Sequence, residues 1–205
     1  MINNISLQSV QENIEKRGFA VKTFSTKEEA TQYISSNIKG QKVGFGGSVT
    51  LDEMGLYEKL TQNNEVVWHW RIPEGMTNAD VLKAARDANV YVSSVNGIAA
   101  TGEIVNIDNT GNRVAATLYG HEKVILVAGV NKIASDLQGA IDRARNIAAP
   151  LNARRLNRKT PCAVKADKCY DCKSPDRICR GLSVLWEKPA GCEYEVILID
   201  ENLGY

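Results

Sequence analysis

A loop rich in glycines and hydroxyl side chains is the first stretch of this sequence that could bind a ligand. It reads GFGGSVT and contains Gly44, Gly46, Gly47, Ser48 and Thr50. Glycines let the backbone approach a ligand closely, and a helix that begins near Ser48 would direct free N–H groups toward an anion. The spacing fits neither the dinucleotide fingerprint nor the Walker loop, so we assign no nucleotide cofactor. The alternative is that the loop is only a tight turn between a strand and a helix.

A second set of polar residues follows the apolar segment VYVSSV. In an open α/β sheet, ligands bind beyond the carboxyl ends of the strands, where these residues are expected to lie. The guanidinium of Arg113 suits a carboxylate or phosphate, and Asp108 could orient it or act as a base. The alternative is that these side chains tie a turn together. The candidate ligand-binding residues in this set are Ser94, Asn96, Asn106, Asp108, Asn112 and Arg113.

Lys132 follows the apolar segment KVILVAGV after one intervening residue, Asn131. A lysine in this place could reach the same crevice, or its ammonium group could be solvated at the surface. Asp108, Arg113 and Lys132 are therefore the candidate catalytic residues, and the sequence establishes a catalytic role for none of them.

Four cysteines form the other chemical signal. Cys162, Cys169, Cys172 and Cys179 are separated by six, two and six residues. The Cys-x-x-Cys pair suits two adjacent positions of a tetrahedral thiolate site, which the flanking cysteines could complete. The spacing does not separate zinc from an iron–sulfur cluster, and free or redox-active thiols are the alternative. Cys192, alone in the segment PAGC, is expected to be a free thiol.

The composition argues against several classes of protein. The chain has 205 residues, of which 43% are apolar and 24% charged, as in ordinary globular proteins. The 25 basic and 24 acidic residues give a net charge of +1, which predicts neither a nucleic-acid partner nor an anionic membrane surface. No signal peptide and no run of eighteen apolar residues is present. We therefore expect a cytoplasmic protein with a small-molecule ligand, and an oligomer is compatible with this sequence.

Strands and helices alternate through most of the chain. Apolar periodicity predicts strands at 19–24, 65–70, 90–95 and 123–130, a strand that ends in the glycine loop, and a hairpin around 100–108. Helices are predicted around 7–14, at 27–39, 51–60 and 77–89, from about 112, and at 136–156 with an interruption at Pro150. This order predicts an α/β fold with a mostly parallel sheet covered by helices.

The tail of the chain has a different character. We expect residues 1–160 to form the α/β domain. Residues 161–205 are expected to form a cysteine-rich, metal-binding loop and a terminal β-hairpin packed on the same domain. The hairpin strands would be LSVLWEK and EYEVILID, joined by PAGC.

The chain from about 42 to 205 resembles the LUD (lactate utilisation) domain family. Typical members carry Gly-Gly-Ser-x-Thr, Ser-x-Asn-Ala-Ile, a Gly-x-x-Val-Asn-x-Asp-x-x-Gly-Asn-Arg-Val-Ala block and Gly-x-Asn-Lys-Ile. The matching segments here are GGSVT, SVNGI, GEIVNIDNTGNRVA and GVNKI. Two departures are Gly97, where alanine is common, and His121, where proline often follows the glycine.

The resemblance implies a fold similar to that of sugar-phosphate isomerases and CoA-transferases. In those proteins a glycine and serine loop holds a phosphate or carboxylate. It also implies a lactate utilisation protein that binds an anionic small molecule and takes part in the oxidation of L-lactate to pyruvate beside iron–sulfur partner subunits. The alternative is a non-catalytic iron–sulfur electron-transfer or assembly subunit of a lactate-oxidising complex. Whether the chain is itself an enzyme stays open.

Overall fold

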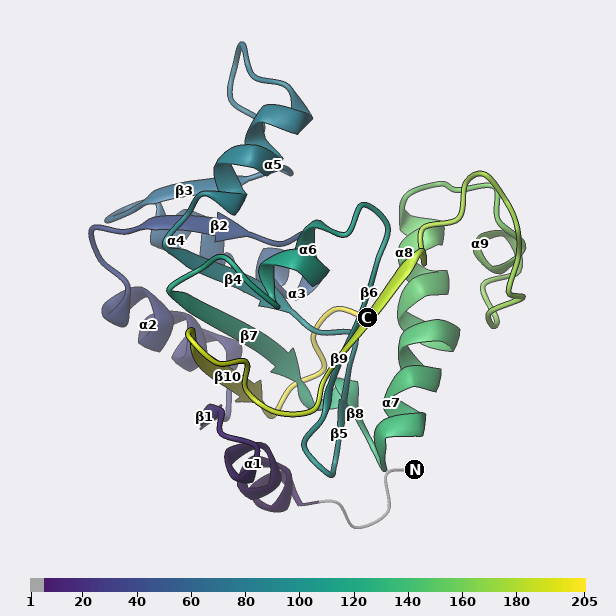
Figure 1. Ribbon diagram of the computed structural model, residues 1–205, viewed down its shortest axis with the longest axis horizontal. Coiled ribbons are helices and arrows are strands. Elements are labelled where there is room, and N and C mark those ends of the chain that lie inside the picture. The colour runs from purple at the N-terminus through teal and green to yellow at the C-terminus, as the bar shows by residue number, and fades with distance from the viewer. Residues whose placement is uncertain (1–5) are drawn as a thin grey trace.

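A six-stranded sheet whose strands all run parallel lies at the centre of the computed structural model, which describes residues 6–205 (Figure 1). Its middle strands are apolar on both faces because helices or a second sheet cover each face. This confirms the predicted α/β fold with a mostly parallel, covered sheet. In spatial order the strands are β1 (Ala20–Phe24), β10 (Glu193–Ile199), β7 (Lys123–Gly129), β4 (Val90–Ser94), β2 (Lys42–Phe45) and β3 (Glu65–Trp68).

Three helices cover one face of this sheet, namely α2 (Lys27–Asn37), α3 (Val49–Glu53) and α4 (Leu56–Leu60). The side chains of Thr26 and Glu29 form the capping box that starts α2. Residues 51–60, expected to be one helix, belong to two, because Gly55 between them has a left-handed backbone with a φ of 61°.

The opposite face of the main sheet packs against α1 (Leu7–Lys16), α6 (Asn112–Ala116) and a second sheet. On this face Gly44 of β2 contacts α5 (Asn78–Arg86), because its missing side chain leaves room for the carbonyl oxygen of Ala85. The second sheet has the order β8-β5-β6-β9, and its strands are β8 (Ile133–Ala134), β5 (Gly97–Ala99), β6 (Ile104–Asp108) and β9 (Gly181–Leu185). Strands β5 and β6 form the hairpin expected around 100–108.

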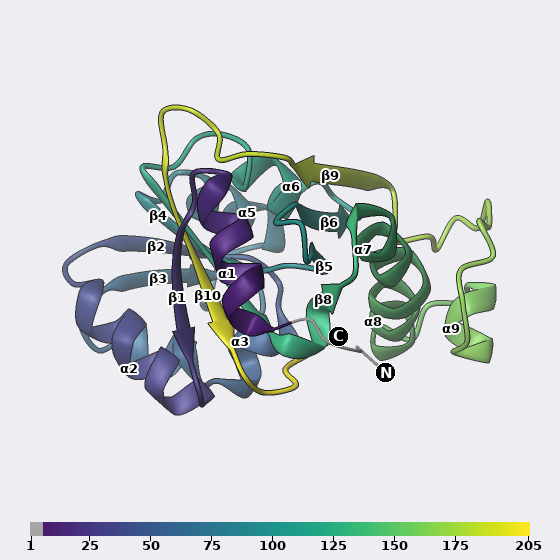
Figure 2. The same cartoon turned by 90° about the horizontal axis from the view of Figure 1, so that it is seen from below.

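The predicted terminal hairpin is wrong. Strand β9 pairs antiparallel with β6 in the second sheet, whereas β10 lies parallel between β1 and β7 in the main sheet (Figure 2). The physical reason is visible in the segment YEVILI, which is buried on both faces. A hairpin strand with one solvated face would alternate apolar and polar side chains, but a central parallel strand is apolar throughout.

A long helix packs on the outer face of the second sheet. It consists of α7 (Leu137–Arg143), a π-helical turn (Ala144–Ala148) and α8 (Ala149–Arg155). The interruption therefore falls just before Pro150, whose ring clashes with the preceding turn and whose nitrogen cannot donate a hydrogen bond. A 3-10 turn, η1 (Val130–Lys132), connects β7 to β8.

The cysteine-rich segment lies beside α8, at one end of the molecule (Figure 2). It begins with α9 (Pro161–Lys165), and residues 166–180 contain no helix or strand. A small core of Ala153, Ala163 and Ile178 attaches the segment to α8. No helix within residues 6–205 is both long and apolar enough to cross a membrane.

Candidate functional site

A pocket of about 380 Å³ opens beyond the carboxyl ends of strands β2 and β4. Its walls are the glycine loop, the residues that follow β3, β4 and β6, the start of α6, the turn η1 and the end of α8. Ligands of open α/β sheets bind at this edge, so the pocket occupies the position predicted from the sequence.

The glycine loop contributes Gly47, Ser48 and Thr50 to the pocket wall. Gly47 is needed for close packing, because an added Cβ would lie 3.1 Å from Nε2 of His69. The hydroxyl of Ser48 accepts a hydrogen bond from the N–H of Leu51 at 3.2 Å and thereby caps α3. These three residues therefore lie where the sequence predicted a binding loop.

The other two glycines of the loop have packing roles. Gly46 makes room for Ser93 and for the side chain of Arg113, with which an added Cβ would collide. Gly44 faces α5 rather than the pocket. The structure therefore brings only part of the predicted loop to the pocket.

Lys132 lies at the base of the pocket and is 3% exposed, so the solvated alternative does not hold. Its Nζ is 2.7 Å from Oγ1 of Thr50 and 2.6 Å from Oγ of Ser94. Burial, together with the positive charges of Arg143 and Arg113, lowers the pKa of Lys132 well below its ordinary value of 10.5. Two hydroxyls thus hold an amine whose affinity for a proton is reduced.

Asp108 uses its carboxylate to begin α6. One oxygen accepts hydrogen bonds from the N–H groups of Arg113 and Val114 at 2.7 and 3.3 Å, and the other accepts from the N–H of Asn109 at 2.8 Å. Gly111, the residue before the helix, has no side chain to cap it. This geometry favours the structural alternative for Asp108 over a role as a base.

Arg113 connects the ends of β4 and β6 across the pocket. Its Nη2 donates to Oδ1 of Asn96 at 3.0 Å and to the carbonyl of Ile107 at 2.5 Å, and its Nη1 donates to the carbonyl of Ser94 at 3.4 Å. The guanidinium is therefore both a structural tie and a positive charge in the pocket wall.

The three predicted asparagines lie in different surroundings. Asn96 and Asn112 line the pocket. Asn106 does not, because it is 1% exposed inside the second sheet, where its Oδ1 has no hydrogen-bond partner among residues 6–205. Gly97, next to Asn96, has a packing role, because an added Cβ would lie 2.6 Å from the carbonyl oxygen of Ala140.

His69, Trp70 and Arg155 are among the pocket residues that were not candidates from the sequence. Strand β3 ends at Trp68, so His69 and Trp70 follow its carboxyl end, and the strand-end rule could have identified them. Burial lowers the pKa of His69; the nearby charge of Asp108 raises it, and the charges of Arg113 and Arg155 lower it. Burial is the largest of these effects, so the pKa of His69 lies below its ordinary value.

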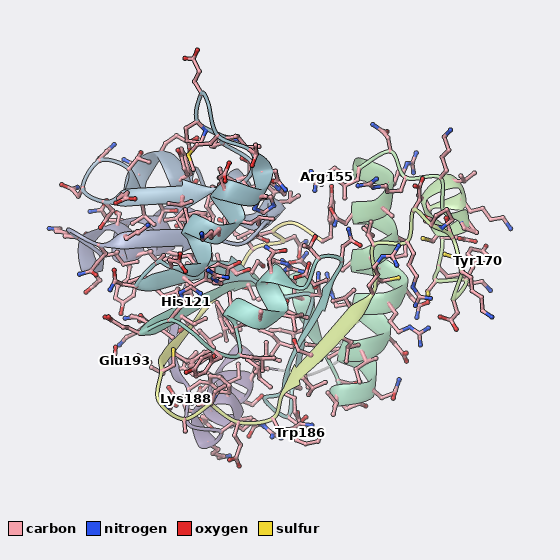
Figure 3. All side chains as sticks on the ribbon, turned by 45° about the horizontal axis from the view of Figure 1, so that its top comes forward. His121, Arg155, Tyr170, Trp186, Lys188 and Glu193 are labelled. Carbon is pink, nitrogen blue, oxygen red and sulfur yellow. The ribbon has the colours of Figure 1, made fainter. Side chains whose placement is uncertain are left out.

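Arg155 extends from the last turn of α8 toward the pocket (Figure 3). Its guanidinium lies 4.6 Å from the centre of the Trp70 ring and donates to Oδ1 of Asn152. Within residues 6–205, Arg155 forms no ion pair with an acidic side chain. A positive charge thus faces the pocket without a compensating carboxylate.

The four predicted metal ligands are free thiols in α9 and the segment after it. Cys162 packs at the small core against α8, and Sγ of Cys169 accepts from the N–H of Asp171 at 3.3 Å. Within residues 6–205, no three His, Cys, Asp or Glu side chains stand close enough together to hold a metal ion. The thiolate donors suit zinc or iron, but their arrangement here does not, so the metal site stays a prediction.

Comparison with protein families gives a match over nearly the whole chain. The family described as LUD domain matches residues 7–199. The chain belongs to the LUD domain family. This confirms the resemblance seen in the glycine loop and in the block from Asn106 to Ala115, and it makes the chain a protein related to lactate utilisation.

Two solved structures resemble this LUD domain protein. A DUF162 family protein from Deinococcus radiodurans is 15% identical, with a TM-score of 0.55 over 94% of this chain and 95% of that chain, and supports the fold. Ribose 5-phosphate isomerase from Plasmodium falciparum is 13% identical, with a TM-score of 0.34 over 53% of this chain and 52% of that chain. That second similarity is too weak to carry an argument. Comparison with curated proteins gives no significant match.

Proposed function

We propose that this LUD domain protein binds an anionic small molecule, a carboxylate or a phosphate, and takes part in the oxidation of L-lactate to pyruvate. The observation that carries this proposal is the convergence of two guanidinium groups, those of Arg113 and Arg155, on one pocket that the amine of Lys132 also lines. The acidic side chain in the same wall, Asp108, is occupied by backbone N–H groups. Guanidinium groups that line a small cavity favour an anion over a neutral ligand.

The shape of the pocket supports a small ligand. Its volume of about 380 Å³ is near the lower end for small-molecule sites, which suits a short carboxylic acid with bound water. Arg155 offers guanidinium donors from one side, and the amine of Lys132, held by the hydroxyls of Thr50 and Ser94, lines the other side. A carboxylate at Arg155 would place the rest of a short acid toward Lys132.

Replacing Arg155 by alanine tests this proposal. We expect calorimetric titration with L-lactate, pyruvate and inorganic phosphate to show saturable binding of at least one of them to the wild type. Arg155→Ala should weaken that binding about tenfold or more, because a hydrogen-bonded charge is lost from the pocket.

The matched control is Arg154→Ala, which removes an exposed arginine of the same helical turn outside the pocket. Its affinity should equal that of the wild type. If Arg155→Ala binds the ligand with the same affinity as Arg154→Ala, the proposed ligand site is contradicted.

We also propose, as the alternative function, that the cysteine segment binds zinc or an iron–sulfur cluster and serves electron transfer or assembly with iron–sulfur partner subunits. The supporting observation is that all four thiols belong to one segment and are only partly buried. Because the thiols do not stand together in the present arrangement, a metal would have to reorganise residues 166–180.

Metal analysis with an absorption spectrum, on protein purified without air, tests this alternative. The wild type is expected to retain zinc, or iron with sulfide. The double change Cys169→Ser and Cys172→Ser should release the metal because it removes the central ligand pair. Cys192→Ser is the control and should leave the metal content unchanged. Equal metal content in the double variant and the wild type would exclude these two cysteines as ligands.

A further inference from the structure

The nitrogen of Lys132 has surroundings that suit an uncharged amine. Its two hydrogen-bond partners within residues 6–205 are the hydroxyl oxygens of Thr50 and Ser94. A neutral amine has two N–H donors, which these two acceptors satisfy, whereas an ammonium group has three. No carboxylate lies within ion-pair distance of Lys132 among the same residues.

The hydroxyl protons near Lys132 have acceptors of their own. Thr50 donates to the carbonyl of Leu203 at 3.2 Å, and Ser94 lies 3.3 Å from Oγ1 of Thr50, to which it donates. Both hydroxyl oxygens are thereby left to accept from the amine. The lone pair of the uncharged nitrogen is not engaged by either hydroxyl and is available to a ligand.

The positive charges around Lys132 also favour its uncharged form. Arg113 and Arg143 lie on the elements packed against it, and their positive charges lower its pKa further than burial alone. Glu53 opposes this effect, but its carboxylate accepts a hydrogen bond from the N–H of Gly204. A buried amine with a lowered pKa, held by two hydroxyls and without a carboxylate partner among residues 6–205, is a competent nucleophile.

We propose that Lys132 forms an imine with the carbonyl carbon of a small 2-oxo acid bound in the pocket. This inference rests on the proposed function, since Arg113 and Arg155 would hold the carboxylate. The nitrogen lone pair attacks the carbonyl carbon, and a proton moves from nitrogen to the oxygen to give a carbinolamine. A C=N bond then forms, and the former carbonyl oxygen leaves as water with both amine hydrogens. No oxidant or reductant is needed.

The substrate class follows from the groups in the pocket. An uncharged amine reacts reversibly with aldehydes and ketones, and the arginines require that the carbonyl compound carry a negative charge. A short 2-oxo acid has both groups on adjacent carbons. Pyruvate, the smallest 2-oxo acid whose carbonyl group is a ketone, is the probe of this class, and L-lactate is its matched analogue with a hydroxyl in place of the carbonyl.

Hydride trapping tests the imine directly. The full-length protein is treated with pyruvate and sodium borohydride at neutral pH, which reduces an imine to a stable secondary amine. We expect an increase in intact mass equal to one reduced pyruvate adduct, with peptide mapping placing it on Lys132. Treatment with L-lactate and borohydride should give no adduct.

Two variants separate a specific adduct from reaction at surface lysines. Lys132→Met should abolish the adduct, whereas Lys83→Met, which removes an exposed lysine of α5, should retain it. Mapping of the wild-type adduct gives the same information if Lys132→Met does not fold. An adduct found only on exposed lysines would overturn the inference.

The trapping result is separable from the binding test. If pyruvate and L-lactate bind in an Arg155-dependent manner but pyruvate gives no adduct, the imine is excluded and the anion site stands. If neither acid nor inorganic phosphate binds and no adduct forms, both proposals fail.

Discussion

Arg113→Ala is expected to lower the free energy of unfolding by about 2–4 kcal/mol. The change removes donors to the carbonyls of Ser94 and Ile107 and to the side chain of Asn96. Ile107 is buried, and a buried acceptor left without a partner costs about 1–3 kcal/mol, whereas the carbonyl of Ser94 also accepts from the hydroxyl of Ser93. Urea unfolding measures the difference.

Arg86→Ala is the matched control for this experiment, because Arg86 is exposed and pairs with the adjacent Asp87 at the surface. Its free energy of unfolding should change by less than about 0.5 kcal/mol. A similarly small change in Arg113→Ala would show that the guanidinium does not tie the ends of β4 and β6 together. The sequence left open whether Arg113 binds a ligand or ties a turn together, and the hydrogen bonds of the structure show the second role.

Lys132→Met is expected to keep the protein folded while removing the nucleophile. At pH 7 the variant should be at least as stable as the wild type, because it replaces a desolvated amine by an apolar side chain of similar length. Thr50 and Ser94 retain hydrogen bonds to Leu203 and to each other. Thermal unfolding at pH 7 compares the stability of Lys132→Met with that of the wild type.

The pH dependence of this stability difference has a defined sign. The pKa of Lys132 is lowered in the folded protein, so between that pKa and 10.5 the unfolded chain binds a proton that the folded chain does not. The wild type should therefore gain stability relative to Lys132→Met as the pH rises toward 10.5. The charges of Arg113, Arg143 and Glu53 are present in both proteins. Their own contributions to the pH dependence of stability therefore cancel when the two proteins are compared. A wild-type advantage that falls with rising pH would show that Lys132 is protonated in the fold.

Much of the fold follows from local sequence signals. The capping pair of Thr26 and Glu29 begins α2, and the alternation of apolar strands and amphipathic helices predicts a parallel sheet. The glycine loop and Ser94 come after strands, so their place at the carboxyl edge of the sheet also follows. Lys132 was a candidate for the same reason.

Other features depend on contacts between residues far apart in the chain. The turn PAGC suggested a hairpin, but β9 pairs with β6 in the second sheet, and β10 pairs with β1 and β7 in the main sheet. Arg155 reaches the pocket because the long helix packs across the second sheet, and no local pattern indicates that direction. Asn106 lies away from the pocket because it stands in the middle of β6, before the carboxyl end of the strand, and its side chain is buried in the second sheet.

A crystal structure of the protein with L-lactate tests the central claim most directly, because lactate has the carboxylate but cannot form an imine. We predict density for the acid in the pocket beyond β2 and β4, with its carboxylate at Arg155 and Arg113 and its hydroxyl directed toward Lys132. Lactate bound at another surface, with only water in this pocket, would contradict the account.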